Sequence, residues 1–146
     1  MDLRILATDI SLRALGWCRH GVYPARKLEA VSRYLRARYF TKHAGGDVQY
    51  ELRDSPRRLV TFHRFNLAVT PYPMGGPFDA IFCRNVIIYF DGETRQHLLE
   101  EIHRLLRPGG YLLVGHAESL AGLKSLFRNV EPSIYVKADG PGEGGA

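Results

Sequence analysis

The stretch at residues 78–91, which reads FDAIFCRNVIIYFD, constrains the fold more than any other part of this chain. Its first five residues form a short, mostly apolar run directly after Gly75, Gly76 and Pro77. Such a run is too short for a helix and too close to residues that break helices, so it predicts a buried strand over 78–82.

Polar residues stand where that strand should end. Cys83, Arg84 and Asn85 follow it, and a second apolar run over 86–90 carries Tyr89 beside them. In an open α/β sheet, ligands bind at the carboxyl ends of the strands, so we expect these residues at the mouth of a crevice. The alternative is a core strand with a solvated turn, because many polar groups at strand ends have no functional role.

Size and composition are those of an ordinary soluble domain or part of one, with 146 residues of which 45% are hydrophobic and 24% charged. No run approaches the roughly 20 apolar residues of a membrane span, and the first residues lack the layout of a signal peptide. We therefore expect a cytoplasmic protein. The net charge of +5 favours acidic partners without choosing among nucleic acid, phosphates and a glutamate-rich protein surface.

Metal-binding patterns are weak in this sequence. Cys18 and Cys83 are far apart and fit neither a disulfide framework nor a CxxC motif, so both are predicted to pack. His116 and Glu118 follow a predicted strand, but two polar residues without a third partner favour a structural role over a metal site.

The chain begins with a predicted strand over 3–8, which Asp9 ends. Ser11 is the expected N-cap of a helix that ends near Gly21. In folds that bind dinucleotides and related adenosine compounds, the acid at the end of the second strand accepts hydrogen bonds from ribose hydroxyls. Asp9 therefore has two candidate roles, cofactor binding and helix capping.

A segment with a different pattern follows residue 24. Apolar residues at helical spacing predict an amphipathic helix over 28–39, and alternation over 48–52 predicts a β-hairpin over 39–52 with a Gly-Gly turn. The basic residues here suit an acidic partner, although a charge run is more often just solvated. They are Arg26, Lys27, Arg33, Arg36, Arg38 and Lys42.

The rest of the chain alternates between strands and one strong helix. A strand over 59–62 ends near Asn66, and Asp91 is the expected N-cap of a helix that the segment at 107–110, Arg-Pro-Gly-Gly, ends. Further strands are predicted over 111–114, 127–130 and 134–137, with a helix or turn over 120–126. The tail over 138–146, rich in Gly and Pro, is predicted to be disordered.

This arrangement resembles the S-adenosylmethionine-dependent methyltransferases of bacterial chemotaxis receptors, the CheR family. The stretch over 78–91 is nearly the family signature, and the strands ending at Asp9 and near Asn66 and the Gly-His-Ala-Glu segment at 115–118 fall in the family's order. The resemblance extends over about residues 5–135. It implies an α/β, Rossmann-like methyltransferase fold.

The family transfers a methyl group from S-adenosylmethionine to glutamate side chains on the cytoplasmic helices of receptors, forming methyl esters and S-adenosylhomocysteine. The resemblance implies cofactor contacts by Asp9 on the ribose or adenine side, by Asn66 and Leu67 at the adenine, and by Arg84 and Asn85 at the methyl-donor end. It implies Arg84 and Tyr89 as the catalytic residues, with Tyr89 close to the sulfonium and the incoming carboxylate.

These residue types suit the reaction. A carboxylate is already ionised at neutral pH, with a reference pKa of about 4.3, so no general base is required. The site must instead align the reacting atoms and remove water from the carboxylate. Arg84 can orient a carboxylate with two parallel hydrogen bonds, and Tyr89 can donate one without carrying charge. Loss of either is expected to lower the rate and leave the fold intact.

Part of the family's cofactor site has no counterpart in this sequence. The family's first strand and its glycine-containing turn lie upstream of the strand over 3–8. In the strand order 3-2-1-4-5 that first strand pairs with the second and the fourth, so the strands over 3–8 and 78–82 each lose a neighbour. We expect a partial methyltransferase domain over 1–137, with about 22–58 as an inserted helix and β-subdomain, that is inactive alone.

The hairpin over 39–52 falls where the family carries its small β-subdomain. Some members use it to hold a receptor's C-terminal peptide as an added strand, which makes such a peptide a second candidate partner. Ala117 stands where the family usually has Ser, so it receives no role.

Other functions stay open. A noncatalytic module would dock on a receptor or other partner through the hairpin and the basic helix. Nucleic-acid methylation is disfavoured, because base methyltransferases often carry Asn or Asp, Pro, Pro and an aromatic residue where residues 84–87 here read Arg-Asn-Val-Ile. A nicotinamide enzyme is disfavoured because GxGxxG is absent.

Overall fold

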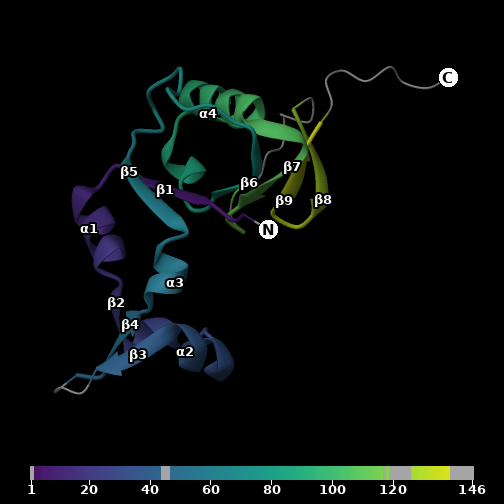
Figure 1. The fold of residues 1–146 in the computed structure, drawn as a ribbon. Helices are drawn as coiled ribbons and strands as arrows, with labels where there is room; N and C mark the ends of the chain where they lie inside the picture. Colours follow the sequence, from purple (N-terminus) through teal and green to yellow (C-terminus); the bar gives the residue numbers. More distant parts are fainter. Residues whose placement is uncertain (1, 44–46, 117, 119–125, 139–146) are drawn as a thin grey trace. The chain divides into compact units, whose positions relative to one another are not determined.

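The computed structural model of the chain describes residues 2–43, 47–116, 118 and 126–138. The chain divides into two compact units, Met1–Asn66 and Leu67–Ala146. The elements of each unit can be followed along the chain in Figure 1. Four predicted features lie wholly or mostly outside the described residues: the Gly-Gly turn at 45–46, Ala117, the helix or turn over 120–126 and the tail over 138–146.

The first sheet of unit 1 is a parallel pair, β1 (Ile5–Asp9) and β5 (Val60–Arg64). Between them in sequence comes α1 (Leu12–His20), which the Ser11 side chain caps and which ends at Gly21 with a left-handed φ of 69°. These three elements confirm the sequence predictions, with boundaries shifted by one or two residues.

The second sheet of unit 1 is antiparallel and has the order β2-β4-β3. Its strands are β2 (Val22–Pro24), β4 (Gln49–Leu52) and β3 (Phe40–His43), so the segment over 39–52 pairs with itself as a hairpin, and β2 adds a third strand that the sequence did not indicate. Three short helices accompany them: η1 (Ala25–Leu28), α2 (Arg33–Tyr39) and α3 (Asp54–Arg57).

The prediction of one continuous helix over 28–39 is wrong. The chain instead forms η1, then a turn in which the Val31 N–H donates to the Leu28 carbonyl (3.0 Å), and then α2. At the start of α2 the Ser32 hydroxyl accepts a hydrogen bond from the Leu35 N–H (3.2 Å). A serine in this place starts a new helix, because it satisfies an N–H group that the first turn leaves unpaired.

Unit 2 is built on one mixed sheet with the order β6-β7-β9-β8. The parallel pair β6 (Phe78–Cys83) and β7 (Leu106–Val114) is connected through η2 (Ile87–Tyr89) and α4 (Gly92–Leu105), a strand-helix-strand unit. The antiparallel strands β9 (Ile134–Lys137) and β8 (Phe127–Glu131) extend it, as predicted. α4 ends at Leu105, and β7 begins at the next residue, Leu106. The 107–110 segment, which was expected to end the helix before a strand over 111–114, is therefore part of β7.

The core of unit 2 lies between α4 and the sheet. α4 begins at Asp91, whose carboxylate accepts a hydrogen bond from the Thr94 N–H (2.8 Å), as predicted. Its apolar stripe is at most 3% exposed and packs with equally buried residues of the sheet. The residues are Leu98, Leu99, Ile102 and Leu105 on the helix, and Leu106, Leu112, Val114 and Phe127 on the strands.

Two burial predictions are wrong. The strand over 78–82 was expected to be buried, yet Phe82 is 70% exposed, because β7 is the one strand that pairs with β6 among the described residues. Cys18 was expected to pack, yet it is exposed on α1, whereas Cys83 is buried as predicted. A short apolar run indicates a strand but does not say how many neighbours cover it.

Replacing Leu98 with Ala tests the core of unit 2. Leu98 is fully buried, so Leu98→Ala should lower the free energy of unfolding by roughly 2–5 kcal/mol, as buried Leu→Ala substitutions do. Urea unfolding followed by circular dichroism measures it. Leu12→Ala is the matched control, because Leu12 is 62% exposed on α1 and should change stability by about 0.5 kcal/mol or less. Equal losses in both variants would contradict this description of the core.

Candidate functional site

Asp9 and Asn66 lie at the same end of the parallel sheet in unit 1. Asp9 is the last residue of β1 and pairs in register with Arg64, the last residue of β5, two positions before Asn66. The Phe65 N–H donates to the Asp9 carbonyl (3.0 Å), which ties the two chain segments together. The structure therefore brings these two predicted site residues to neighbouring carboxyl ends, where ligands bind in open α/β sheets.

The Asp9 carboxylate also has a local task. Its Oδ1 atom accepts a hydrogen bond from the Ser11 N–H (2.7 Å), at the start of α1. Asp9 thus assists the cap of α1 by fixing Ser11, the N-cap residue, as the sequence allowed. It engages one carboxylate oxygen of an exposed side chain, so it is compatible with a second role toward a ligand.

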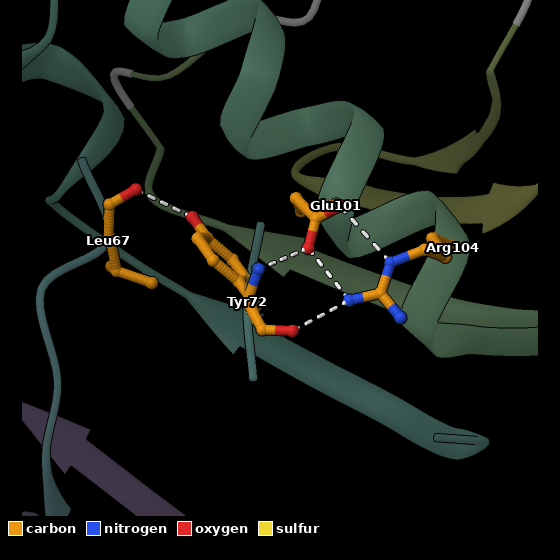
Figure 2. A network of polar contacts seen from close by, with 4 residues as sticks. All are labelled: Leu67, Tyr72, Glu101 and Arg104. Carbon is orange, nitrogen blue, oxygen red and sulfur yellow. Dashed lines mark hydrogen bonds and ion pairs between the residues drawn. The ribbon is translucent and has the colours of Figure 1, made fainter. Parts of the chain in front are cut away.

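Leu67, the first residue of unit 2, is fixed by a network around Tyr72 (Figure 2). The Tyr72 hydroxyl donates to the Leu67 carbonyl (2.6 Å), and the Tyr72 N–H donates to Glu101 on α4 (2.8 Å). Arg104 donates to the Tyr72 carbonyl (3.1 Å) and forms an ion pair with Glu101 (2.7 Å). The segment that begins at Leu67 is therefore anchored to the main helix of the unit.

The charges in this network are matched. The hydrogen bond from Arg104 keeps the pKa of Glu101 below its ordinary value, so Glu101 is ionised at pH 7. Burial raises the pKa of the Tyr72 phenol, so Tyr72 is neutral at pH 7. Sequence reasoning missed all three residues. The available signal was a Glu and an Arg three positions apart on one face of a helix, which is common on solvated helices.

The signature segment after β6 lies beside the end of β7. Because β6 and β7 are parallel, with Cys83 opposite Val114, their following residues meet at one edge of the sheet. We call residues 84–89, which run from Arg84 to the end of η2, the signature loop. It meets the segment around Gly115, the first residue after β7.

A buried carboxylate joins these two segments. Glu118 is 6% exposed, and its side chain accepts hydrogen bonds from the backbone N–H groups of Asn85 (2.9 Å), Val86 (2.8 Å), Ile87 (2.8 Å) and Gly115 (2.5 Å). The sequence predicted a structural role for Glu118, and these contacts confirm it. The sequence did not indicate that the signature loop is what Glu118 holds.

Burial and hydrogen bonding act in opposite directions on this carboxylate. Burial is the largest single influence on its pKa and raises it, but the four backbone N–H groups together outweigh burial and leave the pKa of Glu118 below its usual value. Nearby, burial first and the Glu118 charge second raise the pKa of the Cys83 thiol to about 12. Cys83 is therefore a neutral thiol at pH 7 and not a nucleophile.

Close packing at Gly115 completes the arrangement. A Cβ atom on Gly115 would lie 2.6 Å from Asn85 Oδ1 and 2.7 Å from Glu118 Oε2, which is closer than such contacts occur. Asn85 itself has a left-handed backbone with φ of 57°, a conformation that asparagine tolerates better than most residues. The fit between the two strand ends thus depends on a residue without a side chain.

Arg84 and Tyr89 flank the anchored part of the signature loop. Both side chains are exposed, Tyr89 by 79%, and neither forms a hydrogen bond or ion pair with another described residue. A guanidinium and a phenol with unused donors are suited to bind an anionic or polar ligand. The structure thus brings Arg84, Asn85 and Tyr89 together in unit 2, and Asp9 and Asn66 together in unit 1.

Within the described residues, no group of three or more His, Cys, Asp or Glu side chains could hold a metal ion. The Nδ1 atom of His116 lies 3.5 Å from the hydroxyl oxygen of Ser133. The same part of the chain has no helix that is both long and apolar enough to cross a membrane.

Residues 1–136 match the family described as CheR methyltransferase, SAM binding domain. The chain belongs to the CheR methyltransferase family. Its similarity to the chemotaxis protein methyltransferase of Vibrio parahaemolyticus is 44% identity over 138 residues, 93% of this chain and 50% of that protein. It is 36% identical to the protein of the same name from Borreliella burgdorferi, over 92% of this chain and 47% of that protein. It is 35% identical to the one from Escherichia coli, over 91% of this chain and 47% of that protein.

Membership of the CheR family confirms the resemblance drawn from the signature, the Rossmann-like α/β methyltransferase fold and S-adenosylmethionine as the methyl donor. The chain spans about half the length of the curated relatives that it matches. The individual roles of Asp9, Asn66, Leu67, Arg84, Asn85 and Tyr89 remain predictions.

Gly115→Ala tests the close packing of the two strand ends. The new methyl group meets Asn85 and Glu118, so we expect a loss of roughly 1–3 kcal/mol in the free energy of unfolding, as for other overpacked sites. Gly16→Ala on α1 is the control: no atom lies within 4 Å of its added Cβ, and Ala should stabilise the helix by about 0.5–1 kcal/mol. Urea unfolding midpoints measure both changes. A neutral Gly115→Ala variant would contradict the geometry.

Proposed function

We propose that this chain carries a large part of a site that transfers a methyl group from S-adenosylmethionine to glutamate carboxylates of chemotaxis receptors. The main support is the signature loop, in which a buried carboxylate fixes the backbone while the side chains of Arg84 and Tyr89 bond to no other residue that the structure describes. Membership of the CheR family and relatives named chemotaxis protein methyltransferase support the same function. The proposed substrate places the reaction in the cytoplasm, where the family's receptors carry their glutamate-bearing helices.

The chemistry of the side chains fits this cofactor. The Asp9 carboxylate can accept hydrogen bonds from ribose hydroxyls, and the Asn66 amide, followed by the apolar Leu67, suits an adenine ring. Arg84 and Asn85 are proposed to border the methyl-donor end. When bound, S-adenosylmethionine supplies an electrophilic methyl group. The absence of a metal cluster among the described residues leaves this assignment unchanged, because it rests on hydrogen bonding alone.

The proposed catalytic task of this chain is alignment. The substrate carboxylate is ionised at neutral pH, so Arg84 needs only to orient it and Tyr89 to donate one hydrogen bond to it. Stronger hydrogen bonds to the attacking carboxylate oxygen would make it a weaker nucleophile. The cost of losing either contact is therefore expected in the rate and not in folding, since both side chains are exposed.

We further propose that a first strand with a glycine-containing turn, absent from these 146 residues, completes the cofactor site. Among the described residues β1 pairs with β5 alone and β6 with β7 alone, so each strand has an edge available for another. An unpaired strand edge exposes a row of N–H and C=O groups, which a further strand would satisfy. The 146 residues alone are then inactive.

A receptor's C-terminal peptide is proposed as a second partner at the hairpin over 39–52. β3 pairs with β4 alone among the described residues, which leaves an edge for strand addition. A groove of about 440 Å³ lies on the same subdomain and is lined by Arg33, Arg36, Ala37, Phe40, Lys42 and Tyr50. Its positive charge favours an acidic peptide. A noncatalytic docking module would use this same surface and leave the cofactor site unused.

Calorimetry with S-adenosylhomocysteine separates the two functions. If the cofactor site works once it is complete, a fusion of this chain to the uncovered half of the Vibrio parahaemolyticus relative should bind S-adenosylhomocysteine with micromolar affinity and methylate a receptor fragment. The 146 residues alone should transfer no labelled methyl group. Turnover by these residues alone would overturn the proposed incompleteness, and a folded fusion that binds nothing would favour the docking module.

Conservative variants of the fusion test the two catalytic residues. Arg84→Lys and Tyr89→Phe should each lower kcat roughly 10-fold to 100-fold, the loss expected for one hydrogen bond to a charged group, with unchanged unfolding midpoints. Arg128→Lys and Tyr111→Phe are the controls, because both residues are exposed on β8 and β7 and are assigned no role. Full activity in both catalytic variants would remove Arg84 and Tyr89 from the site.

A further inference from the structure

We propose that Glu118 is the positioning residue of the methyl-transfer site: its carboxylate holds the signature loop in the conformation that presents Arg84 and Tyr89 to the reacting carboxylate. This inference rests on the proposed function for the role of the loop. The contacts of Glu118 with the loop stand independently of that function.

The geometry is that of an anion site filled from within the chain. Asn85 has a left-handed backbone (φ 57°), and Val86 follows with φ of −121° and ψ of −44°. Such a sequence of conformations turns consecutive N–H groups toward one point, a concave arrangement that binds anions. The Glu118 carboxylate occupies it, with Oε1 2.8 Å from the N–H groups of Val86 and Ile87, and Oε2 2.9 Å from that of Asn85.

Within the part of the chain that the structure describes, Glu118 is the acceptor for the N–H groups at the start of this loop. η2 spans only Ile87–Tyr89, so it gives the preceding N–H groups no helical partners. Buried or half-buried N–H groups need an acceptor, and Glu118 supplies one for four residues in a row, with the longest contact to Ile88 (3.4 Å). Arg84 lies directly before these four residues and Tyr89 directly after them, so their placement follows from the same carboxylate.

The charge of the carboxylate matters as well as its shape. A charged acceptor forms stronger hydrogen bonds than a neutral amide of the same size. The titratable group that faces it from β6 is Cys83, whose pKa of about 12 keeps it neutral through the acidic range. His116 lies two residues earlier beside Ser133, and Arg84 is exposed on the loop. Asp91, two positions after the loop, is a second carboxylate with a lowered pKa, so the Glu118→Gln variant separates its titration from that of Glu118.

The direction of the pH effect follows from the lowered pKa. Because the pKa of Glu118 is below that of a free glutamate, its contacts stabilise the loop fully above the ordinary glutamate range and are lost as the pH falls through the folded pKa. A role in packing alone would not depend on this charge.

Amide NMR on the 146-residue chain tests the positioning without any activity. In the wild-type chain the amide resonances of Asn85, Val86, Ile87 and Gly115 should shift together with pH, with one midpoint below the ordinary glutamate value. Glu118→Gln should abolish this shared titration at constant volume and speed hydrogen exchange of the loop amides at least 10-fold, while Leu98 on α4 stays protected. Glu131→Gln, at an exposed glutamate on β8, is the matched control and should leave the loop unchanged.

Methyl transfer by the fusion protein tests the consequence. Glu118→Gln should lower kcat roughly 10-fold to 100-fold, and Glu118→Asp should recover part of it because it keeps the charge. Leu98→Ala, which weakens the fold elsewhere, should keep the kcat of the folded fraction.

The outcomes separate the two proposals. Loop amides that keep their wild-type titration and protection in Glu118→Gln would overturn the positioning role, as would full kcat in that variant. If Glu118→Gln does not fold, the wild-type titration decides, because independent midpoints for the four amides would also overturn it. A wild-type fusion that folds but transfers no methyl group would defeat the proposed function while the NMR result stands.

Discussion

One buried carboxylate holds together the ends of two neighbouring strands in unit 2. Glu118 accepts hydrogen bonds from the backbone N–H groups of the signature loop, and it joins that loop to the end of the neighbouring strand through Gly115. The burial of a charge is costly unless hydrogen bonds compensate for it. Here the compensating donors belong to the signature loop, so the same contacts that make the buried charge tolerable also define the loop.

In unit 2, charged side chains hold the backbone of an irregular segment at two places, with different residues. Around Tyr72, side chains of α4 capture the backbone of a long connecting segment: Glu101 accepts from its N–H and Arg104 donates to its carbonyl. Around Glu118, a single carboxylate captures the backbone after β6. In both places an irregular segment is held by ionised side chains from a regular element or its end, which leaves the segment's own functional groups available.

Local patterns in the sequence were sufficient for most elements but not for their environment. Ser11 and Asp91 cap helices as expected, because capping depends on residues three positions apart. The helix predicted over 28–39 was divided because Ser32 offered a second cap that periodicity does not weigh. The partner of Glu118 lies more than 30 residues away and consists of backbone groups, which no pattern of residue types encodes. The exposure of Phe82 could not be predicted from the sequence either, because it depends on which elements lie beside β6.

The two cysteines end up with opposite chemical character. Cys18 is exposed on α1 in unit 1, whereas Cys83 is buried in unit 2 and its thiol, with a pKa of about 12, carries almost no thiolate near neutrality. Alkylating reagents act on the thiolate, so a brief reaction with a maleimide dye will mark unit 1 alone in the folded chain. The folded 146-residue chain thus offers one exposed thiol for a fluorescent or spin probe, and the rate at which the Cys83 thiol is modified reports how often unit 2 opens.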